Sequence, residues 1–466
     1  MSIDHSHDLV NMECFDVTYT TDIIRKIVEN ILNKKQFNME SIDTWSRQIV
    51  DSCQKSLSEI YNSFKTIITT MIISKNDENI HIGNACLWDY QLDGSTIIKW
   101  ENDSICGFAG NSAPRHIIPT RVTINGNTQH VFDNNSDLTS LRDRLTEFIR
   151  LIYYKYNIAN CRERRVVIIE SVITPTRFRH LLAEILLKQF EASSLAFVPS
   201  HLGATYTLGR STALVLDIGY KEAQIMPVAE GVPLAVQFDS LPYAGQAIHK
   251  EIELLLGQHA LVIHQGQKQS FNEASLKLSD DILEDIKVRC CFISPFTRAQ
   301  IYAKSKLDSN ETFREASPVD YPLGPETVIH IPGIIREFAC EVLFEQDIDG
   351  KSVATLILDS LLQSSLDLRR QFADNILVIG GTAMMPGFLH RLNAELTHLV
   401  NISTYVNKLA IKQFHFHSPP AHLNYTAWLG GSIIGALDTL ESQSIIREKY
   451  LENGIVPDWF TGEQAA

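Results

Sequence analysis

The pattern of hydrophobic residues changes near residues 103–106, and this change constrains the fold more than any other feature. Before it, two amphipathic helical runs are followed by short β-branched segments separated by polar turns. After it, apolar strands alternate with helical runs over the rest of the chain. The sequence therefore predicts two units of different architecture, an α+β unit in residues 1–104 and an α/β unit in residues 105–466.

The first unit is predicted to contain two helices followed by an antiparallel meander. Apolar residues recur at helical spacing in residues 23–32 and again in 42–60, where Trp45, Ile49 and Cys53 share one face. Residues 66–74, 81–88 and 94–100 have the β-branched composition of strands. Gly94 follows Asp93 before the third of these, which favours a hairpin because glycine accepts positive φ.

Composition and charge exclude several classes of protein. The formal charge of −14 gives the chain no general attraction for nucleic acid or anionic membranes. The eight cysteines are scattered without a CxxC pair, so we expect neither a zinc site nor a disulfide module, and we assign no metal ligand. No apolar run approaches the ~20 residues of a membrane span, so we expect no direct membrane insertion.

Residues 10–104 resemble the Tctex-type dynein light chains. The resemblance follows that family's order and spacing and rests on Phe64, Lys65, Lys75, Asn76, His81, Cys86, Trp88, Asp89 and residues 93–95 and 100–102. It implies a two-helix, four-stranded domain that dimerises and holds a peptide of the dynein intermediate chain. That family has one more apolar strand after residue 102, which we expect to be missing here, leaving an open sheet edge.

Residues 106–460 resemble the actin family. The matching motifs come in the family's order and lie at 107–119, 165–170, 214–219, 285–293, 376–387 and 427–435. The resemblance implies an α/β, RNase H-like, two-lobed fold with a helical run at 175–190 and a core helix at 427–435. We expect the actin-like domain to lack a clear first phosphate-binding hairpin, because Ile98 and Glu101 fall where the family's hairpin has aspartate and serine.

Two of these motifs carry the chemistry of a nucleotide site. A strand that ends in Asp-x-Gly presents a carboxylate and a close-approaching backbone, which suit hydrated Mg²⁺ and phosphate. The resemblance implies ATP or ADP as the ligand and these contacts: Asp217, Gly219, Lys287, Gly380, Gly381, Thr382 and Met384. Alternatives stay open, namely a strand-end cap for Asp217, a tight turn for the two glycines, and a solvated helix position for Lys287.

The residues that would support hydrolysis are replaced. The family's water-orienting glutamine falls at Ser200, its histidine after the second hairpin falls at Gln224, and its ribose-contacting glutamate falls at Val288. Tyr220 and Lys221 replace the acidic and glycine positions of the second hairpin. Without a positioned water, hydrolysis loses its main sources of rate. We therefore expect no catalytic residues and only weak or structural nucleotide binding, with His201 a surface or partly hydrogen-bonded histidine.

A short second subdomain narrows the resemblance further. Only 22 positions separate Pro119 from Leu141, where conventional actins use a longer stretch to grip the next filament subunit. Residues 342–345, 352–360 and 455–459 resemble the actin-related proteins at the pointed end of dynactin. This implies a non-enzymatic cytoplasmic, cytoskeletal protein that caps the dynactin filament beside other pointed-end subunits and helps to link cargo. The alternative is a nucleotide-hydrolysing member of the actin, sugar-kinase and heat-shock chaperone superfamily.

The two resemblances meet abruptly at residues 103–106, and two explanations are open. Either the chain is a merged gene model or transcript, or one strand near residues 96–108 serves both units. The sequence does not choose between them.

Overall fold

The computed structural model describes residues 26–27, 30–31, 42–60, 95–99, 103–124, 126–132, 137–162, 164–307, 314–402, 404–438 and 440–457. Contacts within the chain divide it into two units, Met1–Leu87 and Trp88–Ala466, and each is described by itself. Strand β1 (Ser95–Lys99) therefore belongs to the second unit.

Helix α2 (Ile42–Ile60) is the described element of the first unit. Ile49 and Cys53, one helical turn apart, are buried, whereas Arg47 and Asp51 are exposed. The second predicted amphipathic helix is therefore confirmed. Residues 26–27 and 30–31 of the other predicted helix are helical, and the predicted strands at 66–74 and 81–88 lie outside the described residues.

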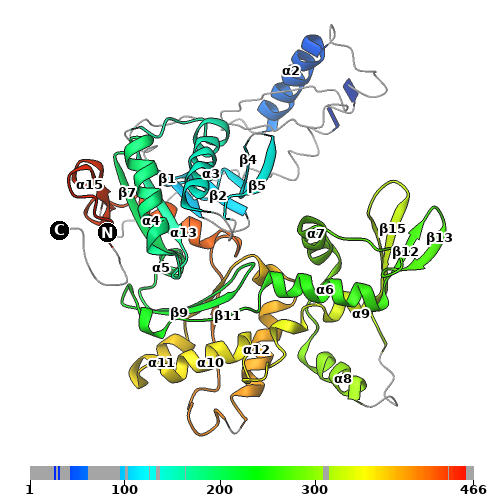
Figure 1. The fold of residues 1–466 in the computed structure, drawn as a ribbon. Coiled ribbons are helices and arrows are strands. Elements are labelled where there is room, and N and C mark those ends of the chain that lie inside the picture. Colours follow the sequence, from blue (N-terminus) through cyan, green and yellow to red (C-terminus); the bar gives the residue numbers. More distant parts are fainter. Residues whose placement is uncertain are drawn as a thin grey trace, which may run out of the picture. The chain divides into compact units, whose positions relative to one another are not determined.

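The second unit begins with a mixed six-stranded sheet (Figure 1). Its strands, in spatial order, are β18 (Ile445–Ile446), β7 (Ser194–Pro199), β6 (Arg165–Glu170), β1, β2 (Asp103–Phe108) and β3 (His116–Pro119). Strand β6 confirms the buried strand predicted at 165–170, because all its residues after Arg165 are buried.

Strand β1 corrects the interpretation of the junction. It runs antiparallel to β2 and parallel to β6, so that Ile98 lies opposite both Cys106 and Ile168. The expectation that residues 94–100 form a strand of the light-chain sheet is therefore wrong. The physical reason is that the buried strand β6 needs a hydrogen-bonding neighbour on each edge, and β7 supplies only one of them.

Helices cover this sheet and bury its core. They are α3 (Leu138–Leu151), η2 (Ile152–Tyr156), α4 (Thr176–Ala183), η3 (Glu184–Gln189) and α15 (Arg447–Asn453). Phe148 from α3 and Leu186 from η3 pack in one cluster with Ile168 of β6. The helical run predicted at 175–190 is confirmed, and between β3 and α3 lies the two-stranded hairpin β4 (Arg121–Ile124) and β5 (Asn127–His130).

A second sheet has the order β10 (Val232–Pro233), β9 (Ala223–Ala229), β8 (Ala213–Ile218), β16 (Ile376–Ile379) and β17 (Phe416–His417), with β11 (Asp239–Leu241) also paired to β9. Helices α10 (Val353–Gln363), α11 (Leu366–Ala373) and α12 (Phe388–Leu399) pack beside it in Figure 1. The short helices η4 (Ala235–Gln237) and η6 (Thr382–Met384) follow strands of this sheet.

A smaller antiparallel sheet lies between β11 and α10 in the sequence. Its order is β13 (Gln267–Ser270), β12 (Leu261–His264), β15 (Thr327–Ile331) and β14 (Val319–Pro322). The associated helices are α6 (Gly245–His259), α7 (Asp280–Cys290), α8 (Phe296–Leu307), α9 (Gly333–Phe338) and η5 (Glu341–Leu343). One core cluster joins this part to the second sheet, since it contains Ile252 of α6, Ile329 of β15 and Ile357 of α10.

Two helices, α5 (Ser200–Tyr206) and α13 (Thr426–Gly435), lie between the two larger sheets, and the short α14 (Leu440–Gln443) follows. They approach so closely that a Cβ atom on Gly430 would overlap the backbone carbonyl of Gly203. Trp428 is fully buried in a cluster that also contains Val167 of β6 and Val215 of β8. The core helix predicted at 427–435 is thus confirmed, and it joins the two lobes of an α/β fold.

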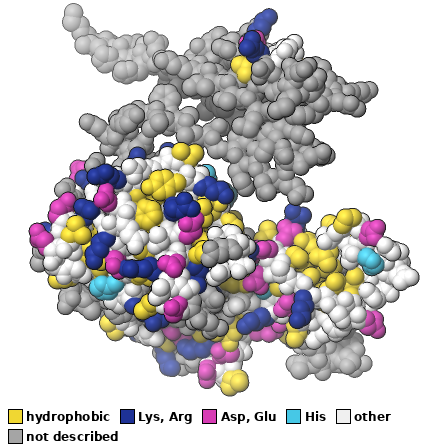
Figure 2. All heavy atoms as spheres, turned by 45° about the horizontal axis from the view of Figure 1, so that its top comes forward, with side chains coloured by type: hydrophobic (Ala, Val, Ile, Leu, Met, Phe, Trp, Pro, Cys, Tyr) yellow, Lys and Arg dark blue, Asp and Glu magenta, His cyan; other side chains and the backbone are white. Residues whose placement is uncertain are grey.

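Among the described helices, none is long and apolar enough to cross a membrane. On the face shown in Figure 2, basic and acidic side chains are interspersed over the described surface.

Candidate nucleotide-binding site

The aspartate and glycine motifs meet at one edge of the second sheet. Strands β8 and β16 are parallel neighbours, and Asp217 lies directly opposite Ile379. Because parallel strands end at the same edge, Gly219 and the pair Gly380–Gly381 follow side by side. Asp217 is 6% exposed, so its carboxylate lies inside this edge. These four residues therefore lie at one sheet edge, although they come from segments more than 150 positions apart.

The two glycines have different roles. Gly380 has a φ of +100°, and a Cβ atom there would overlap the Ile218 carbonyl oxygen and lie 2.7 Å from Asp217 Oδ1. Gly381 has an ordinary helical φ of −66°, and a Cβ atom there would meet nothing nearer than Asn424 Cβ at 4.0 Å. Gly380 is therefore required by the backbone, whereas the space beside Gly381 is open and fits a ligand that approaches the main chain closely.

The turn that follows β8 is held by hydrogen bonds from two other segments. The Gly219 N–H donates to the Glu222 carbonyl oxygen at 3.2 Å. The Gly219 carbonyl accepts from Thr382 Oγ1 at 2.6 Å and from the Gly245 N–H at 3.2 Å. Thr382, which was predicted to contact nucleotide, thus uses its hydroxyl to fasten the second hairpin to η6.

Lys287 lies inside this arrangement and not in solvent. It is 4% exposed, and its ammonium donates to Glu284 Oε2 at 2.5 Å. A Cβ atom on Gly245 would lie 3.4 Å from Lys287 Nζ, 3.1 Å from Thr382 Oγ1 and 3.2 Å from Tyr220 Cδ2. The alternative of a solvated helix position is therefore wrong, because α7 turns Lys287 toward the first residue of α6.

Glu284 connects Lys287 to a second buried group. His249 of α6 is 3% exposed, and its Nε2 lies 2.9 Å from Glu284 Oε2. The other ring nitrogen of His249, Nδ1, lies 3.4 Å from the hydroxyl oxygen of Tyr220. Burial raises the pKa of Glu284, but the hydrogen bonds from His249 and Lys287 and the Lys287 charge outweigh it and lower this pKa to about 2. Glu284 is thus ionised throughout the neutral range.

The positions that replace the family's hydrolytic residues have hydrogen-bond partners of their own. Ser200 is buried, and its Oγ lies 3.2 Å from His201 Nδ1. Gln224 donates to Glu222 Oε1 at 2.7 Å and to Ser171 Oγ at 2.9 Å. Val288 is 61% exposed. His201 is fully buried, so the alternative of a surface histidine is wrong, whereas its contact with Ser200 agrees with the alternative of a partly hydrogen-bonded one.

Met384 is 44% exposed at the end of η6, three positions after Gly381. Its side chain is exposed, whereas Thr382 and Ala383 of the same short helix are buried. Among the residues that the structure describes, no group of three or more His, Cys, Asp and Glu side chains could hold a metal ion.

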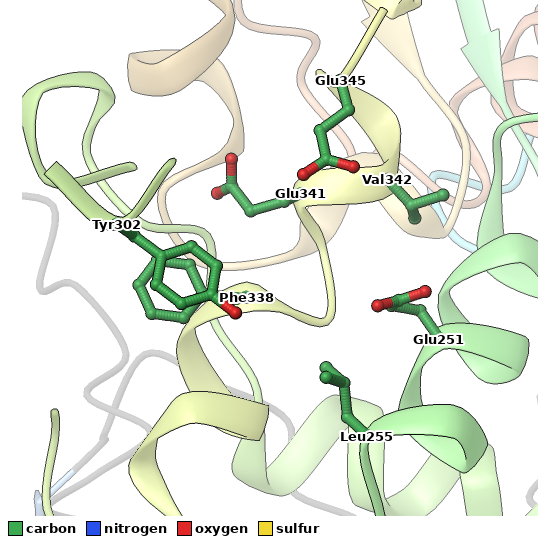
Figure 3. Close-up of a pocket in the computed structure, with 7 residues that line it drawn as sticks. All are labelled: Glu251, Leu255, Tyr302, Phe338, Glu341, Val342 and Glu345. Atoms are coloured by element: carbon green, nitrogen blue, oxygen red, sulfur yellow. The ribbon is translucent and has the colours of Figure 1, made fainter. Parts of the chain in front are cut away.

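A separate, small acidic hollow lies between α6, α8, α9 and η5 (Figure 3). Its lining residues are Glu251, Leu255, Tyr302, Phe338, Glu341, Val342 and Glu345. The rings of Tyr302 and Phe338 stack on one side, and Glu341 is held by two hydrogen bonds from Arg391 at 2.8 and 2.7 Å. Three carboxylates disfavour phosphate, so this hollow does not suit a nucleotide.

Two lobes joined by α5 and α13, with an Asp-x-Gly turn and a glycine pair at one sheet edge, define a protein of the actin fold. The chain belongs to the actin family, since that family's model, described as Actin, matches residues 103–456. A second model, described as the Tctex-1 family, matches residues 14–109, so the chain combines a Tctex-1 segment with an actin-type domain.

Two curated proteins of Dictyostelium discoideum are similar to this chain. "Actin-related protein 10" is 28% identical over 421 aligned residues, which cover 76% of this chain and 86% of the relative. "Putative actin-29" is 26% identical over 408 residues, which cover 81% of this chain and 97% of the relative. Both resemblances stated from the sequence are thereby confirmed at the level of the family.

The two family matches overlap at residues 103–109, which contain all of strand β2. The light-chain match continues past residue 102 to residue 109 and so includes strand β2. In the structure this strand pairs with β1 and β3 of the actin-type sheet. Strand β2 is therefore matched by both families, and in the structure it pairs within the actin-type sheet.

Proposed function

We propose that the chain is a non-enzymatic subunit of the dynein and dynactin system in the cytoplasmic cytoskeleton. Its actin-type domain caps the pointed end of the dynactin actin-related filament, next to other pointed-end subunits, and helps to link cargo. The observation that carries this proposal is the small second subdomain, whose described part is the β4–β5 hairpin, with strands of four residues each. A subunit that lacks one half of a head-to-tail contact ends a filament instead of extending it.

Capping has a distinct quantitative signature. Purified full-length chain, added far below the concentration of filament subunits, should stop elongation at one end only and should leave the other end growing. The measurement is fluorescence microscopy of labelled dynactin-type filaments with polarity-marked seeds. Labelled chain distributed along the filament sides or copolymerised within them contradicts the proposal.

The competing function is ATP hydrolysis, as in the wider superfamily. Ser200 and Gln224 replace the water-orienting side chains, and both are engaged with neighbouring protein groups. We therefore expect no ATP turnover that depends on Asp217. The test compares phosphate release by the unmodified chain and by Asp217→Ala, and turnover that disappears in this variant supports the enzyme instead.

We also propose that the sheet edge binds ATP or ADP weakly or structurally, chiefly through the base and ribose. The supporting observation is the open space at Gly381, beside exposed Met384. Asp217 and Gly219 lie on the side expected for the phosphates, while Thr382 and Lys287 are engaged with protein partners. If nucleotide binds, it supplies a bridge between the segments that end β8 and β16.

A Gly381→Val change tests the nucleotide proposal directly. The added side chain fills the space open to the ligand, so weak nucleotide binding should fall below detection. The melting temperature without nucleotide should change little, because no protein atom lies nearer than 4.0 Å to the new Cβ. Isothermal calorimetry and thermal unfolding measure the two effects, and tight Mg²⁺-dependent ATP binding by the unmodified chain would contradict weak binding.

For the Tctex-1 segment we propose association with the dynein intermediate chain by addition of a peptide strand, the mode that the family resemblance implies. Binding should be poor, because the hairpin β1–β2 pairs within the actin-type sheet. Titration of a labelled intermediate-chain peptide into the full chain measures the affinity. Detection by mass spectrometry of one native peptide spanning residues 90–120 would establish that the two parts occur in one chain.

A further inference from the structure

The polar network around Lys287 explains why nucleotide binding should be weak. Lys287 is the buried cation beside the turn at Gly219 and the first residue of α6. A cation at such an edge would ordinarily attract the phosphates of a nucleotide. Here its charge is matched by Glu284, one helical turn earlier on the same helix, at 2.5 Å.

Glu284 is positioned by more than Lys287. The same oxygen, Oε2, also meets His249 Nε2 at 2.9 Å, and the His249 ring packs edge-on against Tyr220 with centroids 5.2 Å apart. Tyr220 directly follows Gly219, so this network runs from the hairpin through α6 to α7. The glutamate is therefore a fixed negative charge at the edge, with a side chain that is 47% exposed.

We propose that Glu284 sets the ligand preference of this site by neutralising the positive charge of Lys287, so that the edge does not favour a nucleoside triphosphate over a nucleoside. This inference rests on the proposed nucleotide binding and names its ligand class. Glu284 acts through Lys287 and is a positioning residue. The sequence motif predicts that Lys287 contacts the ligand, whereas in the structure its ammonium group donates to Glu284.

Neutralisation of Lys287 by Glu284 predicts different effects on the binding of adenosine and of ATP. In the unmodified chain, adenosine and ATP should bind with affinities within a few-fold of each other. In Glu284→Gln, which keeps a hydrogen-bond acceptor for Lys287 and His249, ATP should bind about ten-fold more tightly and adenosine should be unchanged. A change on the order of ten-fold is expected when one unit charge is removed about 10 Å from one unit of phosphate charge, in an effective dielectric near 20.

Two further variants control for general effects. Asp285→Asn makes the same change in charge one position along α7, at a carboxylate that accepts from Tyr321 at 2.8 Å and pairs with Arg289. It should leave the ratio of ATP to adenosine affinity unchanged. In the double variant Glu284→Gln with Lys287→Met the gain in ATP affinity should disappear, because the freed cation is what attracts the phosphates.

The experiment is calorimetric titration of adenosine and of MgATP into these full-length chains, with thermal unfolding to confirm that each variant is folded. A ratio of ATP to adenosine affinity that is the same in Glu284→Gln as in the unmodified chain overturns the inference, as does an equal shift in Asp285→Asn. Failure of adenosine to bind the unmodified chain, with ATP still gaining in Glu284→Gln, counts against the proposed base and ribose binding and leaves the charge effect standing. No binding of either ligand to any variant rejects both.

Discussion

A chain that begins at residue 105 should fail to fold, whereas a chain that begins at residue 88 should fold as the complete actin-type unit. The shorter chain removes strand β1, which makes four register pairs with β2 and five with β6. It also removes Ser104, which is fully buried and lies 2.8 Å from Thr120 Oγ1. An open β6 edge in the middle of the sheet leaves buried backbone groups without partners, each at a cost of roughly 1–3 kcal/mol.

The expected loss exceeds the whole net stability of a typical domain, which is only about 5–15 kcal/mol. Circular dichroism melting and size-exclusion chromatography compare the two chains, and the matched pair differs only in residues 88–104. A cooperative melt of the 105–466 chain, at a temperature close to that of 88–466, would show that β1 is dispensable. The complementary fragment, residues 1–104, should be marginal and aggregation-prone, because it ends within strand β2, which both families match.

The second large effect is expected at Gly380. A Gly380→Ala change should destabilise the chain by about 2–6 kcal/mol, which combines a strained positive φ with overpacking against a backbone carbonyl. The residue has a φ of +100°, and its new Cβ would overlap the Ile218 carbonyl oxygen and crowd Asp217. The end of β16 would have to move away from β8, and the candidate site would be lost with it.

Gly381→Ala is the matched control, because it adds the same methyl group one residue later. Its backbone already has an ordinary helical conformation, so stability should change by less than about 1 kcal/mol. Urea unfolding of both variants measures the difference. Equal destabilisation at the two positions, or none at Gly380, would refute the distinction between a backbone glycine and a ligand-facing glycine.

Several elements were predictable because their signals are local. The buried strand at 165–170, the helical run at 175–190 and the core helix at 427–435 are apolar segments that also match motifs of the resembled family. The family resemblance assigned the motifs of Asp217 and of Gly380 and Gly381 to one nucleotide site, and the parallel pairing of β8 with β16 places them at one edge. Motif order along the chain carried the assignment without any coordinates.

The burial of Lys287 and of His201 was not predictable from the sequence. Both residues lie in segments of mixed polarity, where a solvated position is the ordinary expectation for a charged or polar side chain. Lys287 is buried because α7 packs against the start of α6, and Glu284 and His249 satisfy it there. The spacing of Glu284 and Lys287, one helical turn apart, was the one available signal for this pair.

The sequence by itself determined the family, the identity of the buried strands and helices, and the residues that meet at the sheet edge. Only the tertiary structure decided which sheet holds β1 and β2 and whether Lys287 faces ligand or protein. The physical reason is the same in both cases. The apolar pattern of a strand predicts that it will pair with another strand. The charge of a buried lysine requires an opposite charge or a hydrogen-bond partner nearby. Neither feature identifies the partner. Those partners lie far apart in the chain or across a helix contact: β6 for strand β1, and Glu284 with His249 beside Lys287.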